Sequence, residues 1–201
     1  MTDVEDAVVA LRSGGLAVIP TDTVYGLACD PYRPGAVERL NEVKGRTSEQ
    51  PIALVAARLD VLFDSLPEVP GRLRVVASEL LPGPYTLVLP NPAQRFPWLA
   101  GGRQDTIGVR VPAVTGVGKT ILELLGALAA TSANLHDGPD PRRVEHVPHE
   151  IASVAVVVDG GELPGTPSTV VDLTAPEPKV LREGAVPHDE ALAHVHRLLP
   201  E

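Results

Sequence analysis

The stretch LAVIPTDTVY (16–25) sets the pattern of the chain, because an apolar run stops abruptly and small polar side chains follow it. The run LAVIP (16–20) is short and wholly apolar, as in a strand that is buried on both faces. Thr21, Asp22 and Thr23 come directly after this run. The sequence therefore predicts a buried strand that ends in hydroxyl and carboxylate groups.

Apolar runs of strand length recur along the chain. They are IALVA (52–56), TLVLP (86–90), TIGVRVP (106–112), LAATSAN (128–134), VAVVVD (154–159) and STVVDL (168–173). Apolar residues at helical spacing fill segments 4–11, 37–43, 69–80, 117–125 and 192–198. Strands that alternate with helices predict an α/β class with a mixed sheet and flanking helices. No repeat or long linker divides the chain, so we expect a single domain over residues 1–201.

The composition is that of an ordinary globular protein, with 44% hydrophobic and 21% charged residues in 201. The formal net charge of −9 disfavours general attraction to nucleic acid or to an anionic membrane. A single cysteine excludes a disulfide framework and a cysteine-rich zinc site. No basic signal sequence begins the chain, and no apolar run approaches the roughly 20 residues of a membrane span. We therefore expect a cytoplasmic protein without membrane association.

Cations and hydroxyls interrupt the apolar pattern where elements end. Lys44 and Arg46 flank a glycine at a predicted helix end, and Thr106 and Arg110 share one face of a predicted strand. Other such positions are Ser132, Asn134, Ser168, Thr169 and Arg182. An arginine is costly to bury without an anion or a carboxylate beside it. Two interpretations stay open: each arginine pairs with a nearby acid, or these groups together form a cradle for phosphate and carboxylate.

Other signals are weaker. The segment TGVGKT (115–120) ends like a phosphate-binding loop, but Ala113 stands where that motif needs its first glycine, so we expect a helix start. Without cysteine partners or an HExxH motif, the paired histidines are expected to be solvated rather than metal-ligating. These are His146, His149, His194 and His196. Cys29, in an apolar stretch, is expected to be a small core residue.

Seven segments resemble, in the same order, motifs of the YrdC-type threonylcarbamoyl-AMP synthases. They are PTDTVYGLACD (20–30), KGR (44–46), PGPYTLVLP (82–90), TIGVRVP (106–112), TSAN (131–134), PSTVVD (167–172) and LREG (181–184). The match runs from about residue 14 to 184, and seven motifs in register make chance similarity implausible. The length resembles the short bacterial form of the family, without the extra C-terminal domain of the longer form.

The resemblance implies a twisted α/β sheet with a wide, concave, positively charged cavity. It also implies a nucleotidyltransferase that condenses L-threonine, bicarbonate (or CO2) and ATP to threonylcarbamoyl-AMP and pyrophosphate, with Mg²⁺ arriving with ATP. The product would pass to a partner transferase complex that modifies the adenosine beside the anticodon of certain tRNAs. Direct tRNA binding by this chain is expected to be weak.

The matching motif positions carry the family's site residues. By this resemblance Thr23, Arg110 and Ser168 hold threonine, with Arg110 gripping the carboxylate through two parallel hydrogen bonds. The positions implied to face ATP are Lys44, Arg46, Thr106, Ser132, Asn134 and Arg182. Lys44 and Arg46 are expected to be catalytic, because they would neutralise charge on the departing pyrophosphate. No protein metal ligand and no obvious base is implied, so catalysis should rest on orientation and electrostatics.

Two departures from the family pattern concern the wall around the ligand. TSEQP (47–51) replaces the proline and the DNP segment that many relatives have, which makes Gln50 a candidate substitute for an asparagine contact. Val55 stands where longer-form relatives have a histidine near threonine. Two other functions stay open: a non-catalytic RNA-binding paralogue of the same fold, and an enzyme that uses another amino acid or carbamoyl donor. The net charge argues against a broad RNA footprint.

Overall fold

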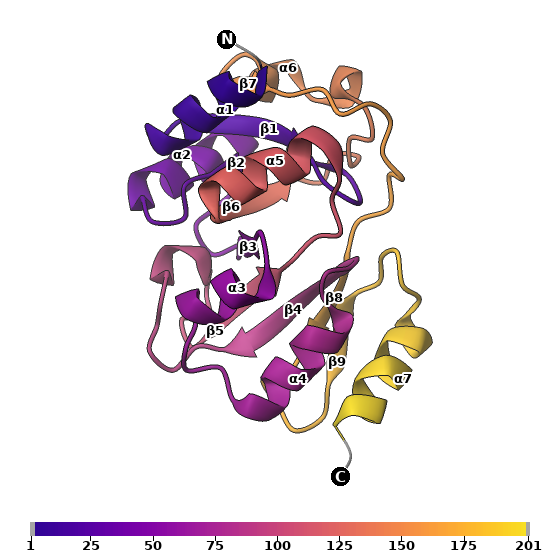
Figure 1. The fold of residues 1–201 in the computed structure, drawn as a ribbon. Helices are drawn as coiled ribbons and strands as arrows, with labels where there is room; N and C mark the ends of the chain where they lie inside the picture. Colours follow the sequence, from indigo (N-terminus) through magenta and orange to yellow (C-terminus); the bar gives the residue numbers. More distant parts are fainter. Residues whose placement is uncertain (1–2, 200–201) are drawn as a thin grey trace.

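The computed structural model describes residues 3–199, in which one nine-stranded sheet has helices on both faces (Figure 1). The strands are β1 (Leu16–Pro20), β2 (Tyr25–Cys29), β3 (Ala53–Ala56), β4 (Tyr85–Pro90), β5 (Thr106–Arg110), β6 (Ala127–Ser132), β7 (Ala155–Val157), β8 (Thr169–Asp172) and β9 (Lys179–Arg182). The α-helices are α1 (Asp3–Arg12), α2 (Pro34–Lys44), α3 (Leu59–Ser65), α4 (Gly71–Leu80), α5 (Gly116–Leu125), α6 (His149–Ala152) and α7 (His188–Leu198). Short 3₁₀ turns are η1 (Pro97–Leu99) and η2 (Val144–His146).

The sheet is mixed, as the alternation of strands and helices predicts. Its order is β7-β1-β2-β6-β3-β5-β4-β8-β9. The pairs β1–β7, β3–β5 and β4–β8 are parallel, and the other neighbours are antiparallel. In Figure 1 the β7–β1–β2 end lies at the top beside α1, and the β4–β8–β9 end lies at the bottom beside α4 and α7. The α/β class and the mixed sheet with flanking helices are confirmed.

The two faces of the sheet carry cores of unequal size. The larger core joins one face to side chains of α2, α3, α4, α6 and α7. The smaller core joins α1 and α5 to the other face of β1, β2 and β6. Helices therefore cover the first face along the whole sheet, and the second face mainly at the β1–β2–β6 end.

Alternate residues of β4 and β5 show the difference between the two faces of the sheet. Leu87 and Val109 point into the larger core and are fully buried. Their neighbours Thr86 and Gly108 point to the opposite face, because successive side chains of a strand alternate. That face holds a cavity rather than a second helix layer, so the strand pattern itself positions the site.

Four of these helices and strands are absent from the sequence expectations: β2, β9, α3 and the four-residue helix α6. β2 begins only four residues after β1 and contains Gly26. Apolar and polar residues do not alternate in YGLAC, so its sequence does not indicate a strand. β9 is an exposed edge strand and lacks an apolar run. α3 has seven residues, too few for a clear helical period. No helix among residues 3–199 has the length and apolarity that crossing a membrane requires.

Candidate active site

A cavity of about 470 Å³ lies on the second face of the sheet. Its floor comes from alternate residues of β4 and β5, and its walls come from the segments around residues 21–26, 49–53, 130–132, 167–170 and 181–182. Six of the nine predicted site residues line it: Thr23, Thr106, Arg110, Ser132, Ser168 and Arg182. The lining includes three arginines, Arg103, Arg110 and Arg182, and one acid, Glu49. Arg103 and Arg110 form ion pairs with Asp172 and Asp22, which leaves Arg182 as the lining arginine without an ion pair among the described residues.

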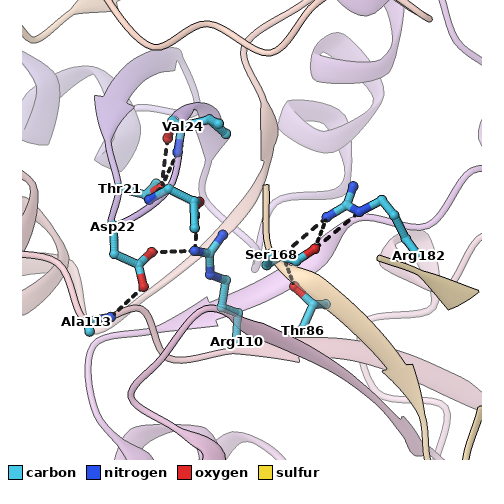
Figure 2. A network of polar contacts seen from close by, with 9 residues as sticks. Thr21, Asp22, Val24, Thr86, Arg110, Ala113, Ser168 and Arg182 are labelled. Atoms are coloured by element: carbon cyan, nitrogen blue, oxygen red, sulfur yellow. Dashed lines mark hydrogen bonds and ion pairs between the residues drawn. The ribbon is translucent and has the colours of Figure 1, made fainter. Parts of the chain in front are cut away.

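Arg110 is the buried cation of the floor, with 9% of its surface exposed. Its Nη2 donates to a carboxylate oxygen of Asp22 and, at 2.9 Å, to Thr23 Oγ1 (Figure 2). The second oxygen of Asp22 accepts the Ala113 N–H at 2.8 Å. Burial and the nearby charge of Arg182 lower the pKa of Arg110, and Asp22 opposes this shift. Both Nη2 protons are thus used within the protein.

The expected two-bond grip of Arg110 on a carboxylate stays a prediction, and the proton count shows which guanidinium atoms are already in use. Two parallel hydrogen bonds to a ligand need two adjacent guanidinium N–H groups, and Nη2 is already occupied by Asp22 and Thr23. Nε is buried and has no partner among the described residues. Nη1 is the corner of Arg110 that a ligand at the cavity can use without displacing Asp22.

Two hydroxyls lie beside Arg110. Thr21 Oγ1 donates to the Val24 carbonyl at 2.7 Å and accepts the N–H groups of Thr23 and Val24. Thr23 Oγ1 lies 3.1 Å from Thr21 Oγ1 and accepts from Arg110 Nη2. One lone pair of Thr23 stays available to accept an N–H of a ligand, such as an amino group.

A second polar group faces the first across the cavity. Arg182 donates through Nε and Nη2 to the Ser168 carbonyl, at 3.2 and 2.9 Å, and through Nη2 to Ser168 Oγ at 3.2 Å. Ser168 Oγ also shares a 2.8 Å hydrogen bond with Thr86 Oγ1. Thr86 is a site residue that sequence reasoning missed. Its signal was available, since it is a hydroxyl residue that alternates with the buried residues of TLVLP.

Lys44 lies behind the cavity wall rather than in its lining. Gly45, at φ 65°, ends α2 in the left-handed region that favours glycine, and this turn separates Lys44 from Arg46. Lys44 Nζ donates to Ser132 O, Asn134 O and Asn134 Oδ1, at 2.6, 2.6 and 2.8 Å. Burial, helped by the charge of Arg46, lowers the pKa of Lys44 to about 8. The three ammonium protons therefore fix the turn that follows β6.

Arg46, in the loop after α2, makes contacts with α2 and with strand β6. Its Nε donates to Asn41 Oδ1 at 2.7 Å, and Nη1 lies 3.4 Å from Thr131 Oγ1. Burial lowers the pKa of Arg46 to about 10. Gln50 does not line the cavity, and its amide lies 2.6 Å from His136 Nε2, so it is a link between two loops rather than a ligand contact. Val55 does line the cavity.

Two predicted residues have internal partners. Asn134 is buried, and its Oδ1 accepts from Ser132 Oγ at 2.7 Å besides Lys44. Thr106 lines the cavity and donates its hydroxyl to Arg103 O at 3.0 Å. Asn134 therefore lies behind the wall with Lys44, whereas Thr106 belongs to the floor.

The four predicted cations have different partners. Arg110 pairs with the carboxylate of Asp22, as the interpretation of a nearby acid predicts. The other three, Lys44, Arg46 and Arg182, have neutral oxygens as their hydrogen-bond acceptors within residues 3–199. Neutral oxygens satisfy donors without cancelling their charge. For these three the phosphate cradle stays a prediction.

The structure tests each of the weaker sequence signals. α5 begins at Gly116, so the segment 115–120 is a helix start. His146 and His149 are exposed as predicted. His194 is an exception to the solvated interpretation, since it is half-buried and its Nδ1 lies 2.7 Å from the Tyr85 hydroxyl. Cys29 is fully buried, and burial raises the pKa of its thiol to about 12, as fits a core residue.

Comparisons with known proteins match the chain over the range that contains the site residues. The Sua5/YciO/YrdC family model, described as telomere recombination, matches residues 9–184. A threonylcarbamoyl-AMP synthase of Pyrococcus abyssi is 37% identical over 90% of this chain and 53% of its own length. One from Bacillus subtilis is 32% identical over 93% and 55%, respectively. A putative one from Mycobacterium tuberculosis is 33% identical over 90% and 83%.

Solved structures agree with these relatives. The crystal structure of P. abyssi Sua5 complexed with L-threonine has a TM-score of 0.87 and 33% identity, over 100% of this chain and 59% of that one. Escherichia coli YciO has a TM-score of 0.77 and 30% identity, over 90% and 89%. The chain thus spans little more than half of the P. abyssi and B. subtilis relatives.

Proposed function

Because the chain belongs to the Sua5/YciO/YrdC family, we propose that it is a threonylcarbamoyl-AMP synthase. The reaction consumes L-threonine, bicarbonate (or CO2) and ATP and releases pyrophosphate, which makes the chain a nucleotidyltransferase. The observation that carries the proposal is one cavity in which the polar corner at Arg110 faces the hydroxyls and guanidinium at Ser168 and Arg182. The printed names of the relatives, and the threonine complex of P. abyssi Sua5, support the same reaction.

The amino-acid subsite lies between the two polar groups of Figure 2. Arg110 Nη1 receives the threonine carboxylate, and Thr23 accepts an N–H of the amino group. Ser168 and Thr86 offer hydroxyls to the side-chain hydroxyl of the substrate. Because an amino acid is a zwitterion, its own amine partly offsets the charge it brings to this corner.

The nucleotide subsite uses the cations whose partners are neutral. Arg182 and the turn held by Lys44 and Arg46 supply the positive potential for the triphosphate. Ser132 and Thr106 line the cavity beside them. Mg²⁺ would arrive with ATP, held by its phosphate oxygens, and would supply charge neutralisation there. Residues 3–199 contain no group of three His, Cys, Asp or Glu able to enclose an ion.

The chemistry needs orientation more than a strong base. The threonine amine and bicarbonate give a carbamate and water. A carbamate oxygen then attacks the α-phosphorus, and the bond to the pyrophosphate oxygen breaks. The chain's residues hold the attacking and leaving oxygens in line and stabilise the charge that develops on the leaving group. The product would go to a tRNA-modifying transferase complex, and the cytoplasmic location stays a prediction.

The test is release of pyrophosphate by the purified chain with ATP, Mg²⁺, bicarbonate and L-threonine. We expect release that depends on threonine and bicarbonate, with threonylcarbamoyl-AMP detected by mass spectrometry. Release that is independent of threonine would contradict the proposal. The RNA-binding alternative is not favoured, because the relatives carry the synthase name; tight tRNA binding without turnover would revive it.

A further inference from the structure

Asp22 is a buried acid of the site to which the sequence resemblance assigns no role. It lies at the back of the Arg110 corner, outside the cavity lining, with 10% of its side chain exposed. One oxygen accepts from Arg110 Nη2 and the other from the Ala113 N–H at 2.8 Å. Figure 2 shows Asp22 between these two partners. Asp22 thus bridges the turn after β1 to the segment that follows β5.

We propose that Asp22 is a positioning residue of the amino-acid subsite, which holds Arg110 so that Nη1 receives the ligand carboxylate. This inference rests on the proposed function, because it assigns the amino acid to this corner. Its basis is the proton count of the guanidinium. Asp22 and Thr23 take both protons of Nη2, and Nε is buried without a partner in the described part of the chain. In Figure 2 Nη1 points toward the Ser168 side of the cavity.

Several hydrogen bonds hold Asp22 in place, so the substrate carboxylate does not displace it from Arg110. Thr21 Oγ1 accepts the N–H groups of Thr23 and Val24, at 3.2 and 3.3 Å, and donates to Val24 O. These bonds lock the turn from which Asp22 projects. The Ala113 N–H holds the second carboxylate oxygen in addition. An incoming carboxylate would have to break this set of bonds to replace Asp22, whereas Nη1 is available at no such cost.

The charge balance supports a fixed partner as well. Arg182 is close enough to Arg110 for its charge to act on it, and the charge of Asp140 acts in turn on Arg182. Asp22 is the carboxylate that contacts Arg110 itself and cancels its charge. Without Asp22, Arg110 would be a buried cation with no acid partner, free to turn toward any anion in the cavity, including the nucleotide phosphates.

The test measures L-threonine binding by calorimetry, with a non-hydrolysable ATP analogue present, for the wild type and Asp22→Asn. The asparagine keeps the shape but removes the charge. We expect threonine binding to weaken by on the order of tenfold, as follows from a misplaced guanidinium, with binding of the ATP analogue changed less than twofold. The preference for threonine over threoninamide, which lacks the carboxylate, should fall by a similar factor.

Three further variants separate positioning from general damage. Asp60→Asn removes a carboxylate from an exposed arginine pair on α3 and should change nothing. In the Arg110→Lys background, Asp22→Asn should weaken threonine binding less than twofold further, because the group it orients is gone. Asp22→Glu keeps the charge but moves it by one methylene, and should weaken threonine binding at least threefold while the protein stays folded.

The outcomes are distinct. Threonine binding by Asp22→Asn within twofold of the wild type, or tighter, overturns the inference, and tighter binding would make Asp22 a competitor of the substrate. Should Asp22→Asn not fold, Asp22→Glu decides, and unchanged binding in that variant overturns the inference. Failure of the wild type to bind threonine overturns the proposed function itself and the inference with it.

Discussion

Lys44 and Arg110 are both buried cations near the cavity, yet the protein holds them in opposite ways. Lys44, 4% exposed, has three neutral oxygens as acceptors. Arg110, 9% exposed, has the carboxylate of Asp22. Neutral oxygens supply hydrogen bonds but leave the charge in place, whereas a carboxylate cancels it. The Lys44 side therefore suits a polyanion, and the Arg110 side suits a ligand that brings little net charge.

Among the substitutions that test the contrast between Lys44 and Arg110, Lys44→Met is expected to have the largest effect. Methionine keeps an unbranched stem but loses the charge and the three hydrogen bonds that fix the turn at Ser132 and Asn134. Removing a preorganised donor and charge near developing negative charge costs about 100- to 1,000-fold in rate. We expect the kcat for pyrophosphate release to fall by that amount.

The matched control is Lys119→Met, since Lys119 is an exposed lysine of α5 that faces Glu123. This variant should retain wild-type turnover. A Lys44→Met protein with turnover within threefold of the wild type would mean that the turn and the charge behind it contribute nothing to the reaction.

Arg110→Lys tests the Arg110 side of the contrast with Lys44. Lysine keeps the positive charge but cannot donate to Asp22, Thr23 and a ligand from one planar group. The loss of one charged hydrogen bond costs about 2 kcal/mol, or about 30-fold in threonine affinity. The affinity for an ATP analogue should change less than threefold, because the cations with neutral partners are untouched.

Arg58→Lys is the control for Arg110→Lys, because Arg58 makes two hydrogen bonds to Asp60 at the surface, at 3.0 and 2.9 Å. Titration calorimetry of both variants gives the comparison. Equal loss of threonine and nucleotide binding in Arg110→Lys would show that the two subsites are not separate.

The buried strands of this fold could be predicted from the sequence, whereas many of the polar contacts could not. Runs such as LAVIP and TLVLP predict buried strands, because burial is a local property of the side chains. The acceptors of Lys44 lie 88 and 90 residues away in the chain, so only the folded structure brings them together. The positions of the cations stood out in the sequence, and the motif resemblance supplied their expected roles. It supplied no role for Asp22 or Thr86, whose contacts are with distant residues.

Substitutions at Gly108 can distinguish an effect on the cavity from an effect on the stability of the fold. It lies on the cavity floor between Thr106 and Arg110, and an added Cβ would meet only Thr86 Cγ2 at 3.8 Å and Ala53 Cα at 3.9 Å. The fold therefore tolerates a side chain here, although the cavity does not. A glycine inside a strand otherwise weakens it.

We expect Gly108→Val to reduce binding of both ligands roughly tenfold by filling the floor, with an unchanged or higher melting temperature, since valine favours strands. Gly108→Ala adds one carbon and should have a smaller effect in the same direction. Ligand binding and thermal unfolding of the two variants check this. A melting temperature that drops with side-chain size would show that Gly108 serves the fold instead of the cavity.

The smallest expected effect is a pH dependence of the Lys44 side that the Arg110 side lacks. Burial, with help from Arg46, lowers the pKa of Lys44 to about 8, while Asp140 opposes the shift. The unfolded chain binds more protons than the native one from about pH 8 up to the ordinary lysine pKa, so this group makes the native state more stable as pH rises through that range. Ligand binding has the opposite sign, because a bound polyphosphate favours the protonated amine.

ATP affinity should therefore fall as pH rises through 8, by about fourfold between pH 7 and 8.5 if Lys44 alone titrates. Calorimetry with ATP and no threonine avoids the substrate amine, and the same series in Lys44→Met should be flat. An undiminished pH dependence in Lys44→Met would assign it to another group. A flat wild-type profile would mean that the neutral oxygens around Lys44 keep its ammonium charged across this range, and the contrast with Arg110 would then lie in geometry alone.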